Sequence, residues 1–95
     1  MPVVKRTLQA HEDFIEIWAY IYPQNPRAAD EMLLAPDRAC IHLSHFPYSA
    51  PLREDFGESV RCHPVADHIL LYKPIEDGIL LVRAVHSARY LPGLL

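Results

Sequence analysis

Hydrophobic residues recur with different periods in the two halves of the chain. Between residues 8 and 45 they are spaced three and four apart, which is the repeat of an amphipathic α-helix. After residue 59 they form short runs rich in isoleucine, leucine and valine, which are typical of β-strands. This arrangement predicts an α+β fold in which the helices precede most of the strands.

The first predicted helix covers residues 8–21. Thr7 is a residue type that caps helix N-termini well. The hydrophobic positions expected to form its buried side are Leu8, Phe14, Ile15, Trp18, Ile21 and Tyr22. The acidic residues expected on its other side are Glu12, Asp13 and Glu16.

A second helix is predicted over residues 26–45. Asn25 can cap it, and Pro26 suits the first helical position, where a missing N–H costs little. The short connection makes the two helices antiparallel neighbours. Pro36 lies inside this helix, so we expect helical structure on both sides of a bend.

Four strands are predicted. Pro2–Arg6 is the first, and Ser59–His63 is the second, ended by Pro64. Ile69–Tyr72 and Ile79–Val85 form a hairpin around the connection from Pro74 to Gly78, because Asp77-Gly78 suits a tight turn.

The last strand is hydrophobic on both of its expected faces. Strict alternation gives one set of Ile79, Leu81, Arg83 and Val85 and another of Leu80, Val82, Ala84 and His86. A sheet exposed on one face alternates apolar with polar residues, so this sheet is expected to need cover on both faces. In so short a chain, a partner is expected to supply part of it. The predicted architecture is an N-terminal strand and an antiparallel helical hairpin packed on one face of a small, mainly antiparallel sheet, in the order β-α-α-β-β-β.

Composition places these elements in one globular domain spanning residues 1–95. Hydrophobic residues make up 51% and charged residues 22%, which is not the composition of a disordered chain. The net charge is −3 and neither half is basic, which disfavours direct binding of nucleic acid. The chain contains neither a run of about 18 apolar residues that could span a membrane nor the start of a secretion signal. We therefore expect a cytoplasmic protein that does not contact membranes.

Two cysteines, Cys40 and Cys62, are expected to be free thiols in the hydrophobic interior. A metal site is the alternative, because His42, His45 and His63 lie near them in the sequence. However, residues two apart on a helix point to different sides, so Cys40 and His42 would diverge. We predict no metal site and no cofactor.

Four stretches together resemble the ParE branch of the RelE/ParE toxins of bacterial toxin–antitoxin systems. They are DFIEIWAYI at 13–21, NPRAAD at 25–30, the segment 37–47 with Asp37-Arg38-Ala39-Cys40 and Phe46-Pro47, and DGILLVRAVHSAR at 77–89. The resemblance implies a non-enzymatic toxin that inhibits DNA gyrase and is neutralised by a ParD-like antitoxin encoded beside it. It also implies a hetero-oligomer with that antitoxin, which reaches DNA only through the antitoxin. Pro36, Ser87 and Tyr90 depart from the family pattern, which puts the activity of the toxin in question.

The same superfamily offers two alternatives: a RelE-like endoribonuclease that cuts messenger RNA on the ribosome, and an inert interaction protein. RNA cleavage needs a base, an acid and cations, and the candidates are Arg61, Arg83 and Tyr90. Acidic residues (Glu54, Asp55 and Glu58) lie where basic ones would help.

The residues expected to bind a target or partner are Trp18, Tyr22, Arg83, His86, Arg89 and Tyr90. Each also has a structural interpretation. Arg83 would then pair with Asp67, Glu76 or a helix carboxylate, and His86 would be a packed strand residue. Trp18 and Tyr22 would be core or helix-groove residues, with Tyr22 the more exposed.

Overall fold

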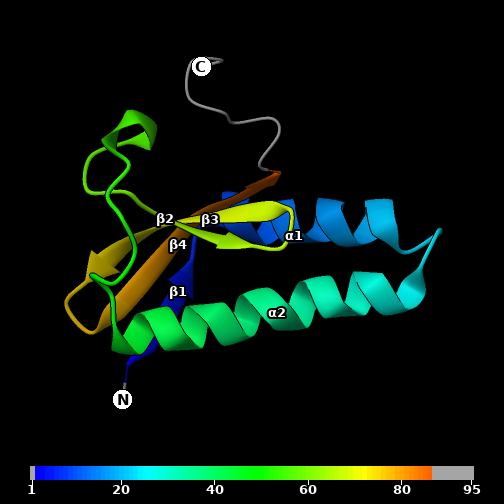
Figure 1. Cartoon of the computed structure of the whole chain (residues 1–95), viewed down its shortest axis with the longest axis horizontal. Helices are drawn as coiled ribbons and strands as arrows, with labels where there is room; N and C mark the ends of the chain where they lie inside the picture. Colours follow the sequence, from blue (N-terminus) through cyan, green and yellow to red (C-terminus); the bar gives the residue numbers. More distant parts are fainter. Residues whose placement is uncertain (1, 87–95) are drawn as a thin grey trace.

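The computed structural model describes residues 2–86. The elements in chain order are β1 (Val3–Arg6), α1 (Leu8–Ile21), α2 (Pro26–His45), the short 3-10 helix η1 (Glu54–Phe56), β2 (Arg61–Val65), β3 (His68–Ile75) and β4 (Gly78–His86). The two helices run antiparallel, side by side, and extend well beyond the sheet (Figure 1). The α+β class, the element order and the bounds of both helices are as predicted.

Both helices begin at the predicted capping residues. The Thr7 side chain accepts a hydrogen bond from the Ala10 N–H at 3.0 Å, and the Asn25 side chain accepts one from Ala28 at 3.1 Å. The helix α2 continues through Pro36 as one element (Figure 1). The ring of Pro36 is fully buried, so its packing offsets part of the cost of the missing hydrogen bond.

The buried side of α1 differs from the prediction. Asp13 is only 5% exposed, whereas Leu8 and Ile15 are 73% and 54% exposed. The side of α1 that faces the sheet is formed by Ala10, Phe14 and the partly buried Ile17. A small residue such as Ala10 lets the helix approach the sheet closely, and sequence spacing alone did not identify that side.

The sheet has the strand order β1-β4-β3-β2, with β1 parallel to β4 and the other pairs antiparallel. At one end of the parallel pair, Val3 lies opposite Gly78 and donates a hydrogen bond to the Asp77 carbonyl at 2.8 Å. A Cβ atom on Gly78 would lie 1.9 Å from the Val3 carbonyl oxygen. Only glycine permits this close approach of β1.

Two of the strand boundaries that differ from the prediction involve prolines. Pro64 lies inside β2 instead of ending it, which is tolerated because β2 is an edge strand and lacks a second neighbour. In the hairpin, β3 runs through Pro74 to Ile75, and only Glu76 and Asp77 form the turn. The pairing of β2 with β3 stops at Tyr72, so the missing N–H of Pro74 does not interrupt that ladder.

A β-bulge explains why both expected faces of the last strand are hydrophobic. Tyr72 pairs with Leu81 and Leu71 pairs with Arg83, so Val82 is an extra residue in β4. The extra residue shifts the alternation by one position. As a result, Ala84 joins Leu81 on the helix side, and Val85 lies in the cluster on the opposite side. The two sets predicted from strict alternation are therefore wrong after Val82.

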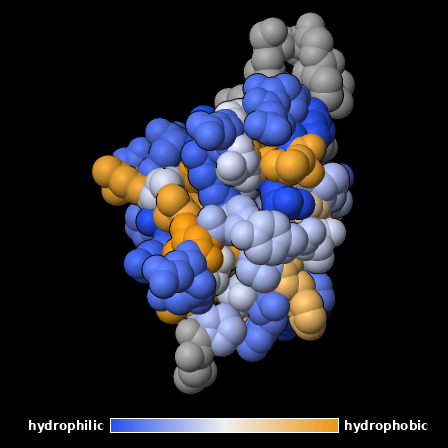
Figure 2. All heavy atoms as spheres, turned by 90° about the vertical axis from the view of Figure 1, so that its left-hand side faces the viewer, coloured by the Kyte–Doolittle hydropathy of each residue, from blue (hydrophilic) through white to orange (hydrophobic). Residues whose placement is uncertain are grey.

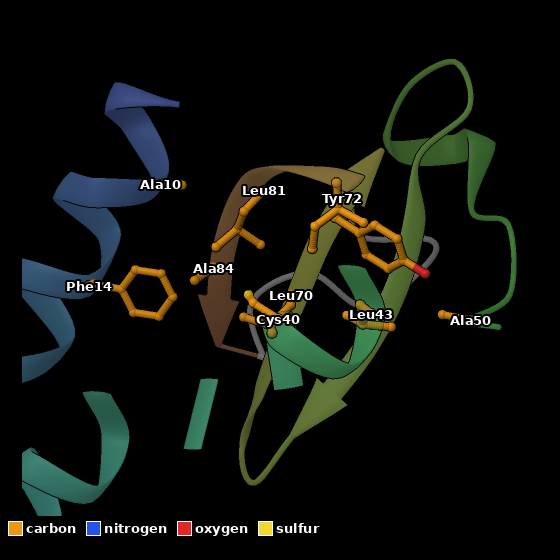
Figure 3. Packing of buried hydrophobic residues seen from close by; sticks show 10 residues of the cluster. Ala10, Phe14, Cys40, Leu43, Ala50, Leu70, Tyr72, Leu81 and Ala84 are labelled. Atoms are coloured by element: carbon orange, nitrogen blue, oxygen red, sulfur yellow. The ribbon is translucent and has the colours of Figure 1, made fainter. Parts of the chain in front are cut away.

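The main core lies between the helical hairpin and the sheet. Its buried residues are Ala10, Phe14, Cys40, Leu43, Ala50, Leu70, Tyr72, Ile79, Leu81 and Ala84. Figure 3 shows Tyr72 beside Leu43, with its hydroxyl pointing toward the loop after α2. That hydroxyl donates to the Pro47 carbonyl at 2.8 Å, so the largest buried side chain also satisfies its polar atom.

A second, smaller cluster covers part of the opposite face. Val60, Cys62, Leu71 and Val85 are buried there, and Phe56 of η1 packs against them. The segment that follows α2 therefore supplies part of the cover that this face was expected to need. Leu80 and Val82 are half-buried. The chain itself thus covers the part over Leu71 and Val85, and cover by a partner stays a prediction for the rest of this face.

Candidate functional site

The edge of β4 changes its partner halfway along the strand. The β1 ladder reaches only Leu81, whose carbonyl accepts the Thr7 N–H at 3.0 Å. Beyond it, the Thr7 hydroxyl donates to the Val82 carbonyl at 2.7 Å, and an Asp13 carboxylate oxygen accepts the Ala84 N–H at 3.0 Å. The side chains of the N-cap residue of α1 and of Asp13 in its second turn thus satisfy backbone groups that a longer β1 would have paired.

Arg83 reaches back to the same carboxylate. Its Nε donates to Asp13 Oδ2 at 2.8 Å and its Nη2 donates to Asp13 Oδ1 at 3.1 Å. Gln9 adds a weaker hydrogen bond at 3.2 Å. Burial by itself raises the pKa of Asp13, but the hydrogen bonds from Arg83, Ala84 and Gln9 outweigh burial and lower the pKa below its ordinary value of 3.8. Asp13 is therefore an anion that joins α1 to β4.

Arg61 is also held by protein groups. Its Nη1 donates to the Ala50 carbonyl at 2.6 Å and lies 3.4 Å from the Tyr48 carbonyl. The guanidinium carbon is 5.0 Å from the centre of the Tyr48 ring, in a cation–π contact. Arg61 thereby fixes the loop that follows α2 against β2.

The aromatic candidates lie at a different place from Arg83. Trp18 and Tyr22 stack with ring centres 4.4 Å apart at the end of α1, and Trp18 Nε1 lies 3.4 Å from an Asp30 carboxylate oxygen on α2. Trp18 is half-buried and Tyr22 is 43% exposed, as their structural interpretation predicts. The structure therefore places the target-binding candidates in two groups, at the far end of the helical hairpin and at the end of β4. Arg89 and Tyr90 lie outside the described residues.

His86 ends β4 opposite His68, the first residue of β3. The two rings meet edge to face with centres 5.2 Å apart. Within residues 2–86, His68 Nδ1 is a buried side-chain atom without a hydrogen-bond partner. Burial lowers the pKa of His68, the neighbouring His86 lowers it further, and Asp67 opposes both effects. His68 was not identified from the sequence, because its significance comes from the cross-strand pairing.

The possible metal ligands do not converge. In the part of the chain that the structure describes, no group of three or more histidine, cysteine or acidic side chains could hold a metal ion. Both cysteines are free and buried, as predicted. Burial raises the pKa of Cys40 to about 11, so its thiol stays protonated. Between residues 2 and 86, neither helix has the length and apolar character needed to cross a bilayer.

A shallow hollow on the surface has a volume of about 640 Å³. It lies where the end of α2 meets the β3–β4 turn, and its lining residues are Pro2, Ser44, Pro47, Tyr48, Pro74, Ile75, Glu76, Asp77 and Gly78. The titratable groups among these described residues are two carboxylic acids and a phenol. A phosphate-rich substrate would need cations in the hollow, and these lining residues supply none.

The face of the molecule seen in Figure 2 is mostly hydrophilic, with hydrophobic residues in separate patches.

Comparison with known proteins establishes the family. The family model described as "ParE toxin of type II toxin-antitoxin system, parDE" matches residues 4–91. The chain belongs to the ParE toxin family. One similar solved structure, described as "Chromosomal ParDE TA system from P. aeruginosa", has a TM-score of 0.75 and 16% sequence identity, and the match covers 90% of this chain and 96% of that chain. That likeness confirms the fold. A search of curated proteins finds no match.

Two of the residues at the β4 edge lie in the motifs that resemble those of ParE toxins. Asp13 begins the first motif and Arg83 lies in the last. Sequence reasoning considered a helix carboxylate as a partner for Arg83, and the structure identifies it as Asp13. The role of Thr7 at the sheet edge was missed, because a helix-capping residue gives no sign that its own hydroxyl will donate to a distant strand.

Proposed function

We propose that this ParE-family protein inhibits DNA gyrase by binding to it without catalysing a reaction, and that a ParD-like antitoxin neutralises it in the cytoplasm. The proposal that the protein is not an enzyme is supported by the contacts of the two arginines that were considered for RNA cleavage. Arg83 is paired with Asp13, and Arg61 is bonded to loop carbonyls. Both guanidinium groups stabilise the fold.

Using Arg83 for catalysis would carry an energetic penalty. Turning its guanidinium toward a phosphate would leave the carboxylate of Asp13, which is 5% exposed, without its cation. Leaving one partner of a buried pair alone costs about 3–5 kcal/mol, and less when the other partner is partly exposed, as Arg83 is. A catalytic site that stabilises the negative charge developing on a phosphate is instead expected to have its cations already directed toward the substrate. This contrast favours inhibition by binding over RNA cleavage.

The proposed contact surface includes the exposed part of the Trp18–Tyr22 stack at the end of α1. An exposed tyrosine supported by a second ring is a rigid anchor of the kind that dominates binding energy in protein interfaces. His86 is exposed at the end of β4 and provides a second candidate contact. Arg83, Arg89 and Tyr90 complete the set proposed from the sequence.

The proposed partner is an antitoxin encoded alongside, in a hetero-oligomer. Membership of a toxin family of type II systems supports this, and so does the similarity to a solved structure from a ParDE system. Contact with DNA would come through the antitoxin, because the chain has a net charge of −3 and neither half of its sequence is basic, whereas binding to phosphate backbones is driven by clustered basic residues.

A supercoiling assay with purified gyrase, relaxed plasmid and ATP tests the proposal. The full-length chain should abolish supercoiling, and prior incubation with the antitoxin should restore it. Tyr22→Ala should weaken inhibition about ten-fold if the stacked ring is an anchor. Tyr20→Ala is the matched control, because Tyr20 is a 76% exposed tyrosine on the same helix, outside the Trp18–Tyr22 stack, and it should inhibit like the unchanged chain.

Cells expressing the chain distinguish the alternatives. Gyrase inhibition should induce a DNA-damage reporter while messenger RNA stays intact. Rapid messenger loss without the reporter would instead establish the ribonuclease and overturn the proposal. Normal growth at a verified expression level would indicate the inert interaction protein.

A further inference from the structure

The outer side of the helical hairpin carries hydrophobic residues at heptad spacing on both helices. On α1, Leu8 and Ile15 are 73% and 54% exposed, and on α2, Leu34 and Ile41 are 46% and 58% exposed. Each pair is seven residues apart, so each forms a straight stripe along its helix. Sequence periodicity assigned Leu8 and Ile15 to the core, but the structure leaves them exposed. We call these four residues the outer stripe.

Both parts of the outer stripe point away from the sheet. On α1 the buried residues are Ala10, Asp13 and Phe14, which lie on the opposite side of a helix with 3.6 residues per turn. On α2 the buried residues are Ala29, Pro36, Cys40, Leu43 and Ser44, which again lie largely opposite the stripe. The two parts are neighbours, because the helices are antiparallel and adjacent along their length (Figure 1).

The charges beside the outer stripe differ between the two helices. On α1, Glu12 and Glu16 are exposed along the flank away from α2, and α1 contains no lysine or arginine. On α2, Arg27 and Arg38 are exposed along the flank away from α1. The surface therefore runs from acidic through hydrophobic to basic across the hairpin.

The remaining acidic residues of α2 have other positions or partners. Asp37 pairs with Arg6, and Asp30 lies beside Trp18 between the helices. Glu31 is exposed on the basic flank, four residues after Arg27, and reduces the net positive charge there. The two arginines still leave this flank opposite in sign to the α1 flank.

We propose that the outer stripe is a self-association surface that binds a second copy of this chain. The surface carries a hydrophobic stripe on each helix, an acidic flank on α1 and a basic flank on α2. It is therefore complementary to a rotated copy of itself, as an interface with two-fold symmetry requires. A two-fold axis parallel to the helices places α1 of one copy on α2 of the other. Hydrophobic stripe then meets hydrophobic stripe, and Glu12 meets Arg38 of the second copy. The result is a four-helix bundle made of two hairpins.

The charges exclude the other face-to-face arrangement. A two-fold axis across the helices would place α1 on α1, so Glu12 and Glu16 would face the same acidic residues of the second copy. Like charges brought together at an interface oppose association. The arrangement with α1 on α2 is therefore the one that this surface favours. It goes beyond the proposed inhibition of gyrase and does not depend on it.

Sedimentation of the full-length chain, made by cell-free synthesis without an antitoxin, tests the proposal over a dilution series from micromolar to submillimolar. The expected species at high concentration has twice the 10.9 kDa mass of the chain. Ile15→Glu should remove that species, and Tyr20→Glu should not, because Tyr20 is exposed outside the stripe. A monomer at every concentration, or an unchanged dimer in Ile15→Glu, would overturn the proposal.

A charge swap tests the orientation of the two copies. Glu12→Arg and Arg38→Glu should each weaken the dimer by roughly ten-fold, because each places like charges opposite one another. The double variant should recover the dissociation constant of the unchanged chain. Failure of the double variant to recover would overturn the arrangement with α1 on α2. Circular dichroism and the unfolding midpoint at a concentration where the unchanged chain is monomeric establish that each variant folds.

Discussion

Asp13 on α1 and Arg83 on β4 form a two-point ion pair, although 70 residues separate them in the chain. The same carboxylate accepts the backbone N–H of Ala84. One side chain thus binds a cation and the open edge of a strand. The pair connects the first helix to the last described strand and keeps Arg83 in a structural role.

Replacement of Asp13 by alanine should lower the free energy of unfolding by about 2 kcal/mol. The variant leaves the Ala84 N–H and the Arg83 guanidinium without their acceptor, while the 34% exposure of the Arg83 side chain keeps the loss below that of a fully buried pair. Urea denaturation measures the change. In a double-mutant cycle with Arg83→Ala, the two losses should add to more than the loss in the double variant. Glu58→Gln, at an exposed acidic position, should stay within about 0.5 kcal/mol of the unchanged chain.

The pH dependence of stability should show the Asp13 interaction at acidic pH. The pKa of Asp13 is lowered in the folded protein, so its contribution is present above the ordinary value of 3.8 and is lost as the pH falls through the lowered pKa. Denaturation curves below pH 4 should therefore show a steeper loss of stability for the unchanged chain than for Asp13→Asn. Parallel curves for the two proteins would mean that the hydrogen bonds of the ionised Asp13 carboxylate add nothing to the stability of the fold.

A separate loss of stability is expected between about pH 7 and pH 5, from histidine. The pKa of His68 is lowered by burial and by His86, and that of His63 is lowered by burial and by His42. The unfolded chain therefore takes up protons first as the pH falls, which destabilises the fold. His68→Phe should flatten the slope in this range, as measured by chemical denaturation.

Gly78→Ala should destabilise the protein by at least about 2 kcal/mol. The added Cβ would lie 1.9 Å from the Val3 carbonyl oxygen and 2.6 Å from the Val3 nitrogen, so β1 would have to move. Hydrogen exchange should report this as lost protection of the Val3 amide, which the Asp77 carbonyl binds. Glu76→Ala in the same turn should preserve that protection, since Glu76 is exposed. Unchanged exchange in Gly78→Ala would show that the parallel pair tolerates a side chain there.

Tyr72→Phe should cost about 1 kcal/mol. The substitution keeps the buried ring but removes the hydroxyl that donates to Pro47, which leaves that carbonyl without its partner. Thermal unfolding of the two proteins under identical conditions measures the loss. A variant as stable as the unchanged chain would indicate that water replaces the hydroxyl at Pro47. Tyr48→Phe is the control, because the Tyr48 side chain is 71% exposed and should not affect stability through this bond.

Local sequence determined the helices of this protein. Thr7, Asn25 and Pro26 specify where they begin through capping geometry, which depends only on neighbouring residues. The bounds of both helices could therefore be predicted. The free state of the cysteines was predicted separately, because the sequence contains two cysteines and no disulfide framework. The family also followed from short contiguous motifs in the sequence.

Contacts between distant residues decided the rest. The bulge at Val82 depends on the register of β4 against β3, and it reverses the faces that alternation assigns to Ala84 and Val85. Asp13 is buried, unlike Glu12 and Glu16, because β1 ends before Ala84 and the carboxylate accepts the backbone N–H that β1 leaves unpaired there. Local periodicity describes which side of an element could be buried. Which side meets a neighbour is settled only when the elements pack, because burial is a property of the assembled chain.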